Sequence, residues 1–212
     1  MPATGVTLEG TLGVPADARG VVLFAHGSGS SRFSPRNRYV AQVLRDAGLA
    51  TLLVDLLSPS EEAVDLATRH LRFDIGLLAD RLVDGLDWLR HGPATRSLRV
   101  GLFGASTGGG AALVAAARRP QEVGAVVSRG GRPDLAGEAL PRVRAPTLLI
   151  VGGYDDVVIE LNRQAMRQMR SEVQLEIVPG ATHLFEEPGT LEQVAALARD
   201  WFLRRLASAG ET

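Results

Sequence analysis

The chain has 212 residues, of which 45% are hydrophobic, and a formal net charge of −1. This balanced charge, with Arg residues scattered among acidic ones, argues against a nucleic-acid-binding protein. The sequence contains neither Cys nor Lys, which excludes disulfides, thiolate zinc sites, Schiff-base chemistry and a Ser-Lys dyad.

The length and hydrophobic content suit one sizeable core, so we expect a single domain over residues 1–212. The first residues lack a basic segment followed by an apolar one. No stretch approaches the roughly 20 apolar residues that a membrane span needs. We therefore expect a cytoplasmic protein without a membrane partner. Nothing in the sequence indicates its oligomeric state.

Short apolar runs alternate with longer segments of helical period, which is typical of parallel strands joined by crossover helices. Residues 5–14 predict an antiparallel hairpin at the edge of the sheet. The strands predicted after it are 20–26, 49–56, 98–104, 123–128, 145–152 and 173–179. The predicted helices are 37–48, 73–91, 107–119, 157–170 and 191–207. The pattern predicts an α/β fold with a mostly parallel sheet.

Two predicted loops, residues 27–36 and 57–72, are longer than a tight connection requires. Both leave from the carboxyl ends of predicted strands. Ligands of α/β sheets bind outside these ends, so we expect the two loops to form walls of a pocket.

The most informative motif is Gly104-Ala105-Ser106-Thr107-Gly108, which ends a predicted strand and begins an Ala-rich helix. This G-x-S-x-G pattern is typical of a nucleophile elbow. There the small flanking residues let strand and helix pack closely around a strained Ser. A pentapeptide of this kind also occurs as a plain strand-to-helix turn. The context favours the elbow, because an acid and a His follow in the order Ser, Asp, His.

The predicted acid and base each follow a later strand. Asp155 comes just after strand 145–152, and His183 lies in the loop after strand 173–179. A Ser hydroxyl needs such a base to remove its proton and a carboxylate to orient that base. Either acid at 155–156 could instead cap a helix, and His183 could be a structural loop residue. We expect Asp155 to serve the His, and Asp156 to be the cap.

An oxyanion intermediate needs backbone donors. We expect one to be the amide of Thr107, directly after the Ser. The other is expected from the Gly-rich turn after strand 20–26, where we assign Ser28. A flexible surface turn is the alternative for this stretch. His26 is expected to be a hydrogen-bonded structural residue.

Together, HGSGSSR at residues 26–32, the elbow, GGYD at 152–155 and PGATH at 179–183 resemble the serine α/β-hydrolases. Within them, the chain is similar to the dienelactone-hydrolase-like branch. The resemblance covers nearly the whole chain. It implies a mostly parallel sheet of about eight strands with helices on both faces, no large cap domain, and a triad on Ser106, Asp155 and His183. Dienelactone hydrolases proper use a Cys in the elbow, so Ser106 points towards ordinary carboxylic esters or thioesters.

Three arginines are candidate substrate ligands. Arg129 follows strand 123–128 at the same edge of the sheet, where a guanidinium could bind a substrate carboxylate in a bidentate pair. Arg32 and Arg36 lie in the loop that carries Ser28. All three could equally bind loop carbonyls or nearby acids. No metal-binding pattern is present, so we expect no metal and no cofactor.

The sequence therefore predicts a serine hydrolase that cleaves small carboxylic esters, thioesters or lactones through an acyl-enzyme. One alternative is a non-catalytic binding module on the same fold, since a fold does not settle function. Another is a nucleotide-binding short-chain oxidoreductase, because glycines 104, 108 and 110 also match its fingerprint. That class needs a Tyr-x-x-x-Lys pair, which a chain without Lys cannot supply.

Overall fold

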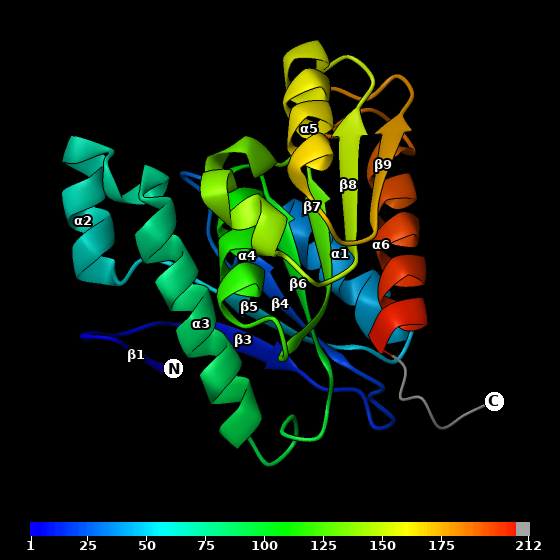
Figure 1. The fold of residues 1–212 in the computed structure, drawn as a ribbon. Helices are drawn as coiled ribbons and strands as arrows, with labels where there is room; N and C mark the ends of the chain where they lie inside the picture. The colour runs from blue at the N-terminus through cyan, green and yellow to red at the C-terminus, as the bar shows by residue number, and fades with distance from the viewer. Residues whose placement is uncertain (207–212) are drawn as a thin grey trace.

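The computed structural model describes residues 1–206, and its centre is a sheet covered by helices on both faces (Figure 1). The sheet has seven strands in the order β3-β5-β4-β6-β7-β8-β9. All neighbouring strands are parallel except β3, which is antiparallel to β5. The strands are β3 (Gly10–Gly13), β4 (Val21–Ala25), β5 (Ala50–Val54), β6 (Val100–Ala105), β7 (Val123–Arg129), β8 (Thr147–Gly152) and β9 (Val173–Val178). The predicted α/β-hydrolase fold is confirmed, with seven strands in this sheet instead of about eight.

The central strands are apolar along their whole length because helices cover both of their faces. Every residue of β4, β5, β6 and β8 is buried. The edge strand β9 instead consists of half-buried and exposed residues, except for its last residue, Val178, which is buried. This pattern fixes the sheet as the middle layer of the molecule.

Two helices cover one face of the sheet, α1 (Pro35–Asp46) and α6 (Thr190–Leu206), and they bury large side chains such as Trp201 and Phe202 there. The other face carries α3 (Ile75–His91), α4 (Thr107–Arg118) and α5 (Asp156–Gln168), together with the 3₁₀ segment η2 (Pro133–Arg142). The helix predicted over 191–207 corresponds to α6, and its last residue lies outside the described residues.

The hairpin predicted for residues 5–14 is wrong. Residues 10–13 form β3, which pairs with β5 instead of with the preceding residues. Residues Val6–Thr7 form the short strand β2, which pairs with β1 (Pro2–Ala3) around a turn at Gly5, whose φ is 78°. The apolar alternation in residues 5–14 belongs to two separate strand pairings, β1 with β2 and β3 with β5. The local sequence does not distinguish these pairings from a single hairpin.

The loop predicted for residues 57–72 is also wrong, because it contains the helix α2 (Pro59–Thr68) and the 3₁₀ turn η1 (Leu71–Phe73). Ser58 caps α2, its side chain accepting from the Glu61 amide, while the Glu61 side chain accepts from the Ser58 amide. Pro59 occupies the first helical position. This Ser-Pro-x-Glu capping box was a readable helix start.

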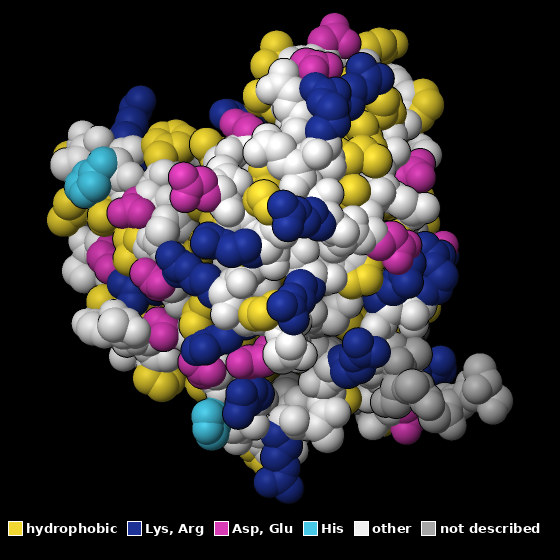
Figure 2. All heavy atoms as spheres, viewed as in Figure 1, with side chains coloured by type: hydrophobic (Ala, Val, Ile, Leu, Met, Phe, Trp, Pro, Cys, Tyr) yellow, Lys and Arg dark blue, Asp and Glu magenta, His cyan; other side chains and the backbone are white. Residues whose placement is uncertain are grey.

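The face over α3, α4 and η2 carries arginines interspersed with acidic side chains (Figure 2). Arg118 pairs with Asp80 at 2.5 Å, and Arg119 pairs with Asp87 at 3.1 Å. Acidic side chains therefore pair with two of the arginines on this face. Within residues 1–206, none of the helices combines the length and apolar character needed to cross a membrane.

Candidate active site

Ser106 stands on the bend between β6 and α4 with φ 49° and ψ −121°. A positive φ in a residue other than Gly is strained by about 1–3 kcal/mol and persists only where the surroundings enforce it. Here the Ser106 amide donates to the Arg129 carbonyl at 3.2 Å, and the Ser106 carbonyl accepts from the Arg132 amide at 3.0 Å. The predicted elbow is therefore present and is held from the neighbouring strand β7.

The glycines of the motif are required by close backbone approach. A Cβ on Gly104 would lie 2.4 Å from the Gly108 carbonyl oxygen, and one on Gly108 would lie 2.3 Å from the Ala25 carbonyl oxygen. Both distances are impossible for a real side chain. Strand β6, helix α4 and the end of β4 therefore pack together at Ser106 only because these positions carry no side chain.

Asp155 and His183 meet at the same edge of the sheet. The His183 Nδ1 lies 2.6 Å from Asp155 Oδ2, across 28 residues of sequence. Asp155 stands at the cap position of α5, yet its side chain makes no capping bond. Asp156 is the first residue of that helix and is exposed, so the expectation that Asp156 is the cap is wrong. The structure thus brings the predicted acid, and not its neighbour, to the predicted base.

The loop that carries His183 is fixed on both sides of the imidazole. Phe185, with φ 55°, is buried beneath the loop. The Thr182 hydroxyl and amide donate to the Glu187 carboxylate at 2.7 and 3.0 Å. The hydrogen bond from the Thr182 side chain is the main reason that the pKa of Glu187 lies below its ordinary value.

The end of β7 contacts both Ser106 and the loop that carries His183. The backbone carbonyl of Arg129 accepts a hydrogen bond from the Ser106 amide. A Cβ on the next residue, Gly130, would lie 3.6 Å from His183 Cε1. The three predicted residues therefore gather at the carboxyl ends of β6, β8 and β9. Among the described residues, no hydrogen bond joins the Ser106 hydroxyl to the His183 ring.

The predicted oxyanion donors lie next to each other. The Ser28 amide donates to the Thr107 hydroxyl at 3.0 Å. A Cβ on Gly27 would lie 3.1 Å from the Ser106 Cβ, so the turn after β4 touches the elbow. The amide assigned to the oxyanion from sequence is thus engaged by a side chain, a contact that the sequence did not reveal.

His26 is a structural residue, as expected from sequence. Its Nε2 accepts from the Leu56 amide at 3.0 Å, so the ring is neutral with the proton on Nδ1, which lies 2.9 Å from the Gly27 carbonyl. Burial lowers the pKa of His26, which favours this neutral form. The ring ties β4 to the segment after β5.

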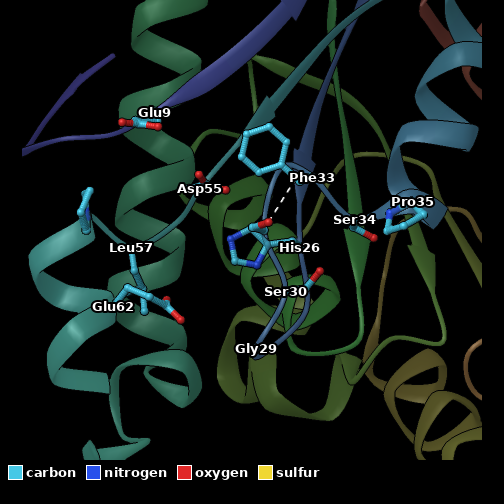
Figure 3. A pocket seen from close by; sticks show the side chains of 12 residues that line it. Glu9, His26, Gly29, Ser30, Phe33, Ser34, Pro35, Asp55, Leu57 and Glu62 are labelled. Carbon is cyan, nitrogen blue, oxygen red and sulfur yellow. Dashed lines mark hydrogen bonds between the residues drawn. The ribbon is translucent and has the colours of Figure 1, made fainter. Parts of the chain in front are cut away.

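A cleft of about 480 Å³ opens beside the turn that carries Ser28 (Figure 3). One wall is the segment 29–35, and the other begins with Leu57 and includes Glu62 of α2. Residues of both segments that were predicted as long loops therefore line the same cleft. Three carboxylates that sequence reasoning missed, Glu9, Asp55 and Glu62, give the cleft an acidic lining, and Ser106 is not part of that lining.

The three candidate arginines differ in their exposure and in their charged partners. Arg32 donates to Asp55 from its backbone amide at 2.6 Å and from its guanidinium, and it pairs with Glu9 at 2.6 Å. Its charge is neutralised within the fold, so we leave Arg32 out of the substrate-binding set. Arg36 is half-exposed and pairs at 3.3 Å with the exposed Glu186.

Arg129 is buried, with 7% of its surface exposed. Its strongest polar contact is a long one, 3.5 Å from Nη2 to the Asn37 side-chain oxygen. Its Nε and Nη1 are buried without a partner among the described residues, and no carboxylate of that part of the chain pairs with it. Burial and the nearby charge of Arg36 lower the pKa of Arg129 to about 10. Sequence could not indicate these surroundings, because Asn37 and Phe185 come from distant elements.

Within the described part of the chain, no cluster of three or more His, Asp or Glu side chains has the arrangement of a metal site.

Comparison with known proteins shows which proteins this chain is similar to. Two curated proteins of Mycobacterium tuberculosis, from strains CDC 1551 and H37Rv, are each 63% identical over 205 residues. Both carry the name "Putative phosphoribosyl transferase". The match covers 97% of this chain but 45% of each relative, so the chain spans less than half of their length.

Among solved structures, a dienelactone hydrolase from Anabaena variabilis is 66% identical with a TM-score of 0.95, covering 97% of this chain and 95% of that one. Est1E from Butyrivibrio proteoclasticus, solved with ferulic acid, is 17% identical with a TM-score of 0.80, covering 96% and 97%. This second likeness concerns the fold alone. Residues 8–207 match the model of the dienelactone hydrolase family. The chain therefore belongs to the dienelactone hydrolase family.

Proposed function

We propose that this chain is a serine hydrolase of small carboxylic esters, thioesters or lactones, with Ser106 as nucleophile, His183 as base and Asp155 as the group that orients the base. The observation that carries the proposal is the 2.6 Å contact between His183 Nδ1 and Asp155 Oδ2, at the same sheet edge as the strained Ser106. An acid bound to the imidazole in this way fixes the tautomer whose Nε2 can accept a proton.

The proposed reaction has two acyl transfers. Ser106 Oγ attacks the ester carbonyl carbon as its proton passes to His183 Nε2, and the carbonyl π pair moves onto the oxygen. The Thr107 amide and a second hydrogen-bond donor beside it stabilise that oxyanion. The carbon–oxygen bond to the leaving group then breaks, and the departing alkoxide takes the proton from His183. Water repeats these steps on the acyl-enzyme and releases the acid and free Ser106.

Arg129 supports a preference for substrates that carry an anion. A buried guanidinium with unpartnered Nε and Nη1 can accept a carboxylate in two parallel hydrogen bonds. Arg36 lies near enough to lower the pKa of Arg129 and would add positive charge to the same ligand. We include Arg129 and Arg36 in the proposed substrate site.

The name of the mycobacterial relatives describes proteins more than twice as long as the matched region. The region that this chain shares with them is the one that matches the dienelactone hydrolase family. We therefore base the proposal on that region and propose hydrolysis as its activity.

The test is hydrolysis of p-nitrophenyl esters with acyl chains of two to twelve carbons, together with a thioester and a lactone. Ser106→Ala is expected to lower kcat by at least about 10⁴-fold, because it removes the nucleophile. Asp155→Asn is expected to lower kcat by about 10² to 10⁴-fold through loss of the correct tautomer. Asp156→Asn, at the exposed neighbouring carboxylate, is the matched control and should retain activity.

Labelling with a fluorophosphonate separates the hydrolase from a binding module on the same fold. The wild-type chain should react at Ser106, and Ser106→Ala should not. Hydrolysis that survives in Ser106→Ala, or a wild-type chain that neither turns over esters nor reacts with the probe, would overturn the proposal.

A further inference from the structure

We propose that the hydroxyl of Thr107, and not the amide of Ser28, is the second donor to the oxyanion. The inference rests on the proposed function and concerns the same site. It starts from the hydrogen bond in which the Ser28 amide donates to Thr107 Oγ1 at 3.0 Å.

This bond occupies the Ser28 amide. A backbone amide carries one hydrogen, and here that hydrogen points at the Thr107 hydroxyl oxygen. The contact joins residues 79 positions apart and is enforced by tight packing. The oxygens of Ala25 and His26 would lie within 2.7 Å of a Cβ on Gly108, so the end of β4 lies against the first turn of α4. The amide therefore holds the hydroxyl in place next to the elbow.

The Thr107 hydroxyl keeps its own hydrogen. A hydroxyl can donate one hydrogen bond while it accepts others. Thr107 is buried, with 5% of the residue exposed. Among the described residues, no group accepts a hydrogen bond from Thr107 Oγ1. Thr107 directly follows Ser106, and an oxyanion on an acyl group of Ser106 has the chemistry to accept this hydrogen bond.

Two donors then come from one residue. Thr107 is the first residue of α4, so its amide has no acceptor within the helix. The amide and the hydroxyl of Thr107 can donate to the same oxygen, at a helix N-terminus that favours negative charge. The bond from Ser28 polarises the hydroxyl and strengthens the bond that it donates. No proton is transferred from Thr107 in this step.

The test compares three variants at this position. Thr107→Val and Thr107→Ala remove the hydroxyl but keep the amide, and each is expected to lower kcat by about 10² to 10³-fold with KM nearly unchanged. Thr107→Ser keeps the hydroxyl, so its kcat should stay within about fivefold of the wild-type value. Thr11→Val, at an exposed Thr of β3, is the control for the substitution itself.

A second readout distinguishes a donor from a structural residue. Phenylboronic acid forms a tetrahedral adduct on a nucleophilic Ser and mimics the oxyanion intermediate. Its inhibition constant should rise in Thr107→Val and Thr107→Ala by a factor similar to the loss in kcat, and it should be retained in Thr107→Ser. Thermal unfolding of each variant reports its folding.

Two outcomes would overturn the inference alone while Ser106→Ala remains inactive. In one, Thr107→Ala turns over at the wild-type rate or faster, as expected if the hydroxyl merely covers the Ser28 amide. In the other, kcat falls without any change in boronic acid affinity. Full activity in Ser106→Ala would overturn the proposed function together with this inference, since no oxyanion would then form at Ser106.

Discussion

Two loops approach Ser106, and they are held in opposite ways. The loop after β4 is held by charge, since Arg32 joins it to Asp55 after β5 and to Glu9 before β3. The loop after β9 is held by the buried Phe185 and by hydrogen bonds between Thr182 and Glu187. Beneath this second loop, the guanidinium of Arg129 lies 5.9 Å from the Phe185 ring without an acidic partner among the described residues.

This comparison indicates that Arg32 and Arg129 contribute differently to the stability of the fold. Removing a guanidinium from water is unfavourable, and nearby carboxylates offset that penalty. Arg32 has two such carboxylates, whereas Arg129 has none in the described part of the chain. We therefore expect the buried charge of Arg129 to contribute unfavourably to folding. This supports its proposed role in binding an anion.

Replacing Arg129 by Met should produce the largest effect in this comparison. On an ester that carries a carboxylate, such as mono-p-nitrophenyl succinate, kcat/KM is expected to fall by about 10 to 100-fold with loss of the charge-assisted hydrogen bonds. On p-nitrophenyl butyrate, the rate should be unchanged. The Tm should be unchanged or higher, because a buried uncompensated charge is removed. An equal loss on both esters would contradict a role in anion binding.

Replacing Arg32 by Met should act on stability instead. The substitution leaves Asp55 and Glu9 without their partner, and we expect the free energy of unfolding to fall by about 1–2 kcal/mol, between the values for exposed and buried pairs. Urea denaturation measures this change. Arg38→Met, at an exposed Arg of α1, is the matched control. If the variant discriminated between charged and neutral esters differently from wild type, Arg32 would belong to the substrate site after all.

Glu187→Gln should give the smallest effect, and that effect should depend on pH. The pKa of Glu187 is lowered in the folded state, chiefly by the Thr182 side chain, so its carboxylate stabilises the fold above the ordinary Glu value and ceases to do so as pH falls through the lowered value. The Tm of the variant should lie below that of wild type at pH 7, and the difference should narrow as the pH falls below the ordinary Glu value. Thermal scans from pH 3 to 7 test this. Glu138→Gln, at an exposed residue, should show no such trend, and a Tm difference for Glu187→Gln that does not narrow on acidification would refute the assignment.

The parts of the site that sequence predicted are those whose signal is local. The elbow at Ser106, the acid after β8 and the His after β9 each follow directly from a strand and the turn that ends it. The capping box at Ser58 was equally local, and the helix it begins could have been predicted. The choice of Asp155 over Asp156 rested on position, and the contact with His183 agrees with it.

The parts that sequence could not predict depend on contacts between distant segments. Arg32 and Arg129 look alike as residues that follow strands, and only the fold places Glu9 and Asp55 beside the first. Residues 10–13 pair with β5 because the sheet provides an edge there, which no local pattern records. The Thr107 hydroxyl likewise meets Ser28 only through the packing of β4 against α4.

The left-handed backbone of Ser106 has a consequence for protein engineering. Glycine adopts φ near 49° without the steric penalty that Ser bears there, so we expect Ser106 to lower the thermal stability of the protein relative to Gly at this position. Ser106→Gly would release that strain and remove the proposed nucleophile in one step. Under the proposed mechanism, this variant would be a more stable and inactive form of the protein, suited to capturing intact esters in crystals.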